Sequence, residues 1–141
     1  MSRVQDCPFC DVIAGRVPGA LAYDDGRFFV LMGRYQPTGP GYALVVPHAH
    51  VPDLHSLSAQ DCGPMLQMVQ RTSAAMQTAF GATGTTVSQN NGPPGQTVMH
   101  LHFHVVPRRP GDGYPRRADE AEPTAILVQQ AATLAGALDV L

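Results

Sequence analysis

The chain has 141 residues, of which 44% are hydrophobic and 14% are charged, and its formal net charge at neutral pH is -2. These values fit one globular domain with a single core. A protein that binds nucleic acid in bulk would show a basic stripe, so the slightly acidic balance argues against that class. All nine basic residues are arginines, which excludes lysine Schiff-base chemistry and a lysine-dependent phosphate loop.

The start of the chain is polar, and no later segment reaches the roughly 20 apolar residues that a membrane span needs. We therefore expect no signal peptide, no transmembrane helix and no membrane partner, and we predict a cytoplasmic protein. Three cysteines are too few, and odd in number, for a secreted disulfide framework. Cys62 lies in a helical pattern and is expected in the core.

Two buried strands are predicted in the first third of the chain. Residues 24–26 give a turn signal, and the apolar run over 28–32 behind them predicts a strand. A loop rich in proline and glycine at 37–41 leads to a second strand over 42–46, which Pro47 ends.

One long amphipathic helix is predicted over about 59–80. Residues 58–61 resemble a capping box with an aspartate in place of the usual glutamate, and Gly81 ends the segment. The apolar residues that recur at helical spacing are Cys62, Met65, Leu66, Val69, Met76 and Phe80.

The second half of the chain predicts two more strands and a second helix. Residues 85–88 are β-prone, and 97–106 are strongly strand-like, with Pro107 at the end. Residues 108–121 predict an exposed loop, and a C-terminal helix follows over about 123–138. The whole predicts an α+β fold, an antiparallel sheet with one long helix packed on it.

Three histidines alternate with apolar residues in the last predicted strand. A strand would place His100, His102 and His104 on one face and Leu101 and Phe103 on the other, with neighbouring imidazoles about 6.5–7 Å apart. Neutral imidazole can act as a nucleophile, an acid, a base or a metal ligand. The alternatives are a tolerated row of surface histidines and a metal site, although three collinear histidines cannot all reach one tetrahedral zinc.

The loop before these histidines offers amide, hydroxyl and backbone donors. Glycines allow a backbone to approach an anion closely, so the loop is a candidate oxyanion cradle. Its polar residues and glycines are Asn90, Asn91, Gly92, Gly95, Gln96 and Thr97.

Cys7 and Cys10 form a CxxC pair with the spacing of a zinc half-site. A redox pair would normally open a helix in a thioredoxin-like unit, which the pattern does not predict, and two free thiols are the plain alternative. The imidazoles available to complete a zinc site are His48, His50, His55, His100, His102 and His104.

The stretch GQTVMHLHFHVVPR at 95–108 resembles the signature of the histidine triad (HIT) family. The similarity extends from CPFC at 7–10 through ALVVPHAHV at 43–51, and so covers most of the chain. It implies a HIT-like fold: a five-stranded antiparallel sheet, one long helix and a C-terminal helix. We expect a single domain over 1–141, with a core at about 7–108 and a C-terminal loop and helix at 109–141.

The resemblance also implies roles for individual residues. His102 would be the nucleophile that attacks the α-phosphorus and forms a nucleotidyl-histidine, which water then hydrolyses. The implied phosphate contacts are Asn90, Gln96, Thr97 and His104. The implied ligands of a structural zinc, as in the CxxC-containing branch, are Cys7, Cys10, His50 and His100.

The expected function is therefore an AMP-type nucleotide hydrolase or transferase that acts on a nucleoside phosphoramidate or a related ester or anhydride, as a homodimer with a purine nucleotide substrate. One alternative is a dinucleoside polyphosphate hydrolase or phosphorylase, which the Arg-rich segment 108–117 would favour. Another is a nucleotide-binding regulatory module with little turnover. Two positions depart from the family: Tyr42 stands where histidine is frequent, and Arg34 where an acid or asparagine near the ribose is common.

Overall fold

The computed structural model describes residues 6–115 and 118–141, and in these ranges five strands form one antiparallel sheet in the order β1-β2-β3-β5-β4. The strands are β1 Leu21–Asp24, β2 Phe28–Met32, β3 Ala43–Pro47, β4 Gly84–Ser88 and β5 Phe103–Arg108. The helices are α1 Pro8–Ile13, α2 Ala59–Phe80 and α3 Thr124–Asp139, with a 3-10 turn at Leu54–Ser56. The predicted α+β architecture with a five-stranded sheet, a long helix and a C-terminal helix is confirmed.

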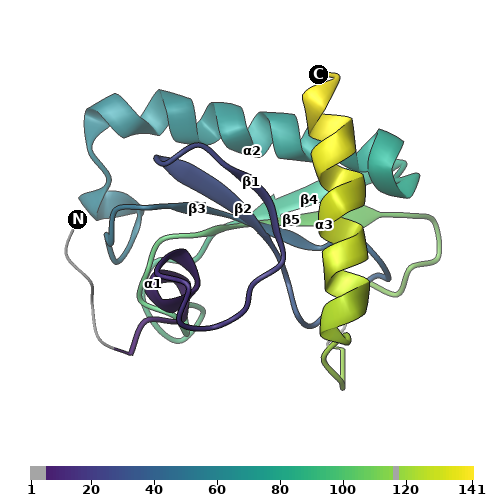
Figure 1. The fold of residues 1–141 in the computed structure, drawn as a ribbon, viewed down its shortest axis with the longest axis horizontal. Coiled ribbons are helices and arrows are strands. Elements are labelled where there is room, and N and C mark those ends of the chain that lie inside the picture. The colour runs from purple at the N-terminus through teal and green to yellow at the C-terminus, as the bar shows by residue number, and fades with distance from the viewer. Residues whose placement is uncertain (1–5, 116–117) are drawn as a thin grey trace.

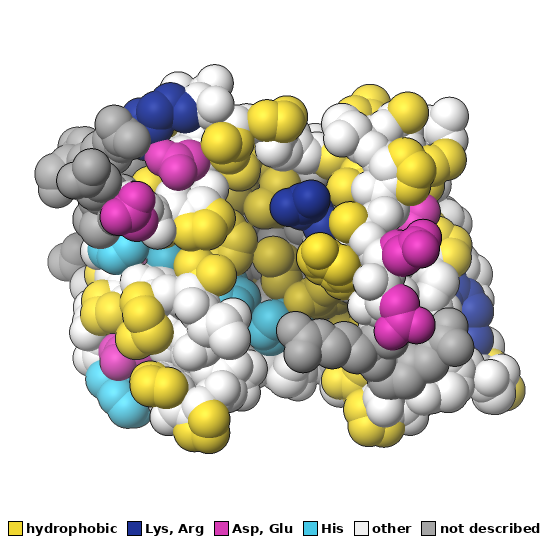
Figure 2. Space-filling model, turned by 90° about the horizontal axis from the view of Figure 1, so that it is seen from below, with side chains coloured by type: hydrophobic (Ala, Val, Ile, Leu, Met, Phe, Trp, Pro, Cys, Tyr) yellow, Lys and Arg dark blue, Asp and Glu magenta, His cyan; other side chains and the backbone are white. Residues whose placement is uncertain are grey.

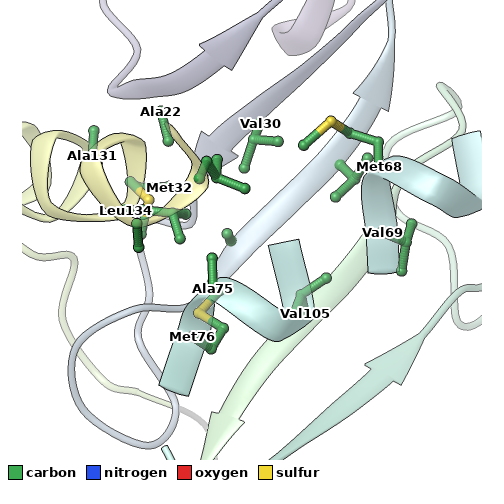
Figure 3. Packing of buried hydrophobic residues seen from close by; sticks show 14 of the residues in the cluster. Ala22, Val30, Met32, Met68, Val69, Ala75, Met76, Val105, Ala131 and Leu134 are labelled. Carbon is green, nitrogen blue, oxygen red and sulfur yellow. The ribbon is translucent and has the colours of Figure 1, made fainter. Parts of the chain in front are cut away.

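The two faces of the sheet have different partners. Successive side chains on a strand point to opposite faces, so β2 contributes Val30 to one hydrophobic cluster and Phe29 to another. Val30 packs with buried residues of α2 and α3, among them Met76 and Leu134 (Figure 3). Phe29 packs with residues of the CxxC segment such as Phe9. Figure 1 accordingly shows α2 and α1 on opposite sides of the sheet.

Helix α2 follows the predicted range, but the capping box expected over 58–61 does not form, because the Ser58 hydroxyl donates to the Asp61 carboxylate and caps no backbone amide. Gly81 adopts φ 65°, and its amide donates to the carbonyl of Gln77 at 3.0 Å, as glycine C-caps do. Pro64 inside the helix has no N–H for the carbonyl of Gln60. The guanidinium of Arg27, from the β1–β2 turn, donates to that carbonyl at 3.1 Å and also pairs with Asp61.

The structure corrects several expectations. The strand expected over 97–106 begins only at Phe103 and continues through Pro107, whose carbonyl accepts a hydrogen bond from the hydroxyl of Thr38. Cys62 was expected in the core but is exposed, because the buried side of α2 begins only at Met65. Strand β1 and helix α1 were not predicted, since both are short and lack clear periodicity.

None of the helices among the described residues combines the length and apolar character that a membrane crossing requires.

The core can be tested on α3, which carries both a buried and an exposed aliphatic residue. Leu134 is fully buried, whereas Val128 is 53% exposed. We expect Leu134→Ala to lower the free energy of unfolding by about 2–5 kcal/mol, since it removes buried methylene groups and leaves a cavity. Val128→Ala should change it by less than about 0.5 kcal/mol. Chemical denaturation measures both, and equal losses would contradict this placement of α3.

Candidate functional site

The histidine segment lies beside the sheet and enters it only at β5. The amide of Leu101 donates to the carbonyl of Val51 at 2.8 Å, which holds the segment against the chain that leaves β3. Leu101 is fully buried in the cluster that includes α2, and His100 is fully buried as well. Leu101 and Phe103 pack with the cluster of α2, whereas His100 and His102 contact Phe9 of the other cluster, so the expected alternation is kept although His100 and His102 precede the strand.

Four side chains from three parts of the chain converge on one point. The ligand atoms of Cys7, Cys10, His50 and His100 all lie within 4.8 Å of one another. The Sγ of Cys10 is 3.3 Å from Nδ1 of His50, and the Sγ of Cys7 is 3.4 Å from Nδ1 of His100. The two Nδ1 atoms are 3.1 Å apart. Of the other four imidazoles, His48 pairs with Asp24, His55 is exposed, and His102 and His104 lie outside the cluster.

The donor set fits zinc. Around a tetrahedral zinc, with Zn–N of about 2.0–2.1 Å and Zn–S of about 2.3 Å, ligand atoms lie about 3.3–3.8 Å apart. The Nε2 of His100 lies 2.8 Å from the carbonyl oxygen of Pro47. That carbonyl can only accept, so Nε2 carries the proton and Nδ1 keeps its lone pair for a metal. Burial raises the pKa of the Cys7 thiol, so a metal would have to displace its proton.

His102 is held in one tautomer by the backbone. Its Nδ1 lies 2.7 Å from the carbonyl oxygen of His100, so Nδ1–H donates and Nε2 carries the lone pair. Burial lowers the pKa of His102, which keeps the ring neutral near pH 7. A neutral imidazole with a free nitrogen is the form that a nucleophile needs.

Phe9 lies between the Cys/His cluster (Cys7, Cys10, His50 and His100) and His102. It is buried between the two cysteines of the CxxC pair, in α1. Its ring makes edge contacts with His100 at 5.6 Å and with His102 at 5.0 Å between centroids. A shift of α1 would therefore displace the ring of Phe9 and change its contact with the His102 ring.

His104 occupies the sheet face opposite α2. It pairs with Leu44 of β3, which belongs to the same cluster as Phe9. Its Nδ1 lies 2.5 Å from the hydroxyl oxygen of Tyr42, a partnership that the sequence did not predict. Burial lowers the pKa of His104 to about 4, and the neighbouring His102, 4.9 Å away between ring centroids, adds to this effect.

The loop over 89–97 is braced by Gln96. The Gln96 amide donates to the carbonyls of Pro52 and Val98 and accepts from the amide of Gly92. Because its polar atoms are used in this way and the side chain is 4% exposed, Gln96 holds the loop in place. Asn90 and Thr97 are exposed.

The arginines differ in whether their guanidinium groups are bonded to other groups of the protein. Arg108 bonds to Asp112 and Thr86, and Arg109 donates to three backbone carbonyls. Arg34 is exposed. The remainder of the Arg-rich segment, at 116–117, lies outside the described residues.

The face of the molecule on the α1 side of the sheet is hollowed (Figure 1 and Figure 2). Figure 2 shows a depression between two raised parts, with hydrophobic side chains on its floor and histidine side chains at its margin. An apolar floor beside convergent polar groups is the usual form of a small-molecule site.

Comparison with known proteins identifies the class to which this fold and site belong. The family model described as the HIT domain matches residues 14–111, so the chain belongs to the HIT family. The adenosine 5'-monophosphoramidase of Schizosaccharomyces pombe is 32% identical over 109 residues, which are 77% of each protein.

Two solved structures extend the likeness to almost the whole chain. A Hit-like protein involved in cell-cycle regulation from Bartonella henselae has a TM-score of 0.85 and 30% identity, and the match covers 97% of this chain and 99% of that one. A zinc-bound histidine triad family protein from Mycobacterium smegmatis has a TM-score of 0.80 and 29% identity, over 96% and 94%. The Cys/His cluster and the zinc-bound relative place the chain with the zinc-binding branch.

Zinc binding by the Cys/His cluster can be tested with a pair of cysteine variants. We expect the purified protein to contain about one zinc per chain and Cys7→Ser to lose most of it, because a hydroxyl is a poor zinc ligand. Cys62→Ser is the matched control, since Cys62 is exposed and outside the cluster. Metal analysis and thermal unfolding measure the outcome. Equal zinc content in the two variants would contradict the assignment.

Burial of His104 also predicts a pH dependence of stability. An ordinary histidine has a pKa of about 6.5, whereas the pKa of His104 is about 4. The unfolded chain therefore binds a proton more readily, and stability that is present above about pH 6.5 is lost as the pH falls toward 4. The free energy of unfolding should fall by up to about 1.4 kcal/mol per pH unit on this account.

His104→Asn should give a shallower dependence than the wild type, and His55→Asn, which replaces an exposed histidine, is the control. Urea unfolding at several pH values between 4 and 7 measures the slopes. A slope for His104→Asn as steep as that of the wild type would refute the assignment.

Proposed function

We propose that this protein is a nucleotide hydrolase or transferase that cleaves AMP-type phosphoramidates, or related esters and anhydrides, through a covalent nucleotidyl-histidine at His102. The observation that carries the proposal is the tautomer of His102, whose Nδ1 is bonded to the His100 carbonyl so that Nε2 is free to attack. The monophosphoramidase relative supports the substrate class.

The reaction divides into two displacements. The lone pair on Nε2 of His102 forms a bond to the α-phosphorus while the bond from phosphorus to the leaving nitrogen or oxygen breaks. Water then attacks the phosphorus and breaks its bond to His102, so that its hydroxyl stays on the nucleotide. Overall, the remaining proton of that water balances the one taken up by the leaving group.

The nonbridging phosphate oxygens need donors while negative charge develops on them. We assign this role to His104, Thr97 and Asn90. His104 adjoins His102. The side chains of Thr97 and Asn90 are exposed in the loop braced by Gln96.

We further propose that a zinc ion is held by Cys7, Cys10, His50 and His100, as their ligand-atom separations favour. Such an ion would cross-link α1 to the histidine segment and would take no part in the displacements. It would stabilise the position of Phe9 against the ring of His102.

We propose one domain over 1–141, because α3 shares a hydrophobic cluster with α2 and the sheet. The active form is proposed to be a homodimer. Strand β4 is the last in the sheet order, and Val87 on it is 44% exposed, which leaves an edge that a second copy can cover. The alternative of a dinucleoside polyphosphate enzyme draws no support from Arg108 and Arg109, which are bonded within the protein.

The mechanism predicts an acid-labile AMP adduct. The protein is incubated with adenosine phosphoramidate and, separately, with diadenosine tetraphosphate, and peptides are examined by mass spectrometry. We expect an adduct on His102 with the phosphoramidate, and we expect His102→Ala to lower kcat/KM by about 10³-fold or more. His55→Ala, which replaces an exposed histidine, should keep full activity. Full activity of His102→Ala would disprove the mechanism, and binding of AMP without turnover of either substrate would indicate a regulatory module.

A further inference from the structure

Tyr42 and His104 form a close pair at the edge of the candidate site. The hydroxyl oxygen of Tyr42 lies 2.5 Å from Nδ1 of His104, and the two rings are nearly parallel, with an interplanar angle of 9°. Tyr42 comes immediately before β3, and His104 lies on β5, the strand paired with β3. The pair therefore rests on the sheet itself, which fixes the distance between the two side chains.

The protonation states of the two groups indicate which of them donates this hydrogen bond. Burial raises the pKa of Tyr42, so its hydroxyl stays protonated, and burial lowers the pKa of His104 to about 4, so its ring carries one N–H. Within 6–115 and 118–141, neither atom of the pair has another hydrogen-bond partner. If Nδ1–H donated, the hydroxyl hydrogen of Tyr42 and the Nε2 lone pair of His104 would both lack a partner among the described residues, whereas a hydroxyl that donates leaves only Nε2–H open. The hydroxyl is therefore the donor.

The backbone around Tyr42 is built to hold the ring in place. A Cβ added to Gly33 would lie 2.2 Å from Cδ2 of Tyr42, so the ring packs directly on a position that only glycine can occupy. The amide of Gly33 donates to the carbonyl of Tyr42 at 2.8 Å. The buried Gln36 accepts from the amide of Tyr42 at 2.9 Å and donates to its carbonyl at 3.2 Å.

We propose that Tyr42 is a positioning residue for the phosphate site: its hydroxyl donates to Nδ1 of His104 and so fixes the imidazole proton on Nε2, where it can donate to a phosphate oxygen. This inference rests on the proposed function for the role of His104. It gives the neighbouring imidazoles opposite tautomers. His102 offers a lone pair at Nε2 because a carbonyl accepts from its Nδ1, and His104 offers a proton at Nε2 because a phenol donates to its Nδ1.

The same pair explains how the chain works with tyrosine where the family often has histidine. An imidazole at position 42 could be donor or acceptor toward His104, depending on its own tautomer. A phenol keeps its proton across the neutral range, and here its hydrogen has one acceptor among the described residues. Tyrosine at this position thus permits a single arrangement of the pair.

The test reads the tautomer of His104 without substrate. Nitrogen-15 shifts of the histidine rings distinguish a protonated from an unprotonated Nδ1. We expect wild-type His104 to carry its proton on Nε2, and Tyr42→Phe, which removes only the hydroxyl, to show both tautomers. Tyr23→Phe is the matched control, because the Tyr23 hydroxyl, as far as the described residues show, bonds only to Asp25 at the exposed β1–β2 turn. A wild-type proton on Nδ1, or a tautomer unchanged in Tyr42→Phe, would overturn the proposal.

Kinetics add a second readout. With adenosine phosphoramidate, Tyr42→Phe should lower kcat by about tenfold with a smaller change in KM, since the lost donor matters most when charge develops on phosphate. Gly33→Ala should mix the tautomers as well, because it displaces the ring while the hydroxyl is still present. Unchanged kcat in Tyr42→Phe would overturn the positioning role. A wild type that turns over no nucleotide refutes the proposed function alone, as the tautomer is measured independently.

Discussion

His100 is the residue on which the site depends. It is fully buried, and each of its polar groups has a different partner. Nδ1 faces the two cysteines and His50, Nε2 donates to the Pro47 carbonyl, and its own carbonyl accepts from His102. One buried residue thus connects the Cys/His cluster and the end of β3, through its imidazole, with the proposed nucleophile, through its backbone carbonyl. A buried polar group is stable only when its hydrogen bonds are satisfied, so these three connections depend on one another.

Much of the fold could be predicted because its long elements carry strong periodicity. Helix α2 matched the range 59–80, and β2 matched 28–32, since a buried strand is a continuous apolar run. Residues 97–102 were expected in a strand because apolar and polar residues alternate there. The alternation is real, but it comes from a segment held by the carbonyl of Val51 outside the sheet ladder. Local pattern does not distinguish these two cases.

The candidate site was predicted in its residue types and only partly in its arrangement. The set Cys7, Cys10, His50 and His100, taken from family resemblance, is brought together by the structure. The tautomers of His102 and His104 were beyond sequence reasoning, because they are set by a backbone carbonyl and by a tyrosine from another strand. The bracing role of Gln96 was also beyond sequence reasoning, because its amide bonds to backbone groups of its own loop and to the distant Pro52 carbonyl.

The contact of Arg27 with α2 has a mechanical consequence. The carbonyl of Gln60, left without a helical partner by Pro64, is taken up by a guanidinium from the turn between β1 and β2. The same guanidinium pairs with Asp61. The first turn of α2 and the tip of the β1–β2 hairpin are therefore fastened together. Fraying of either one would release the other, so the two should open as a single cooperative unit in hydrogen exchange.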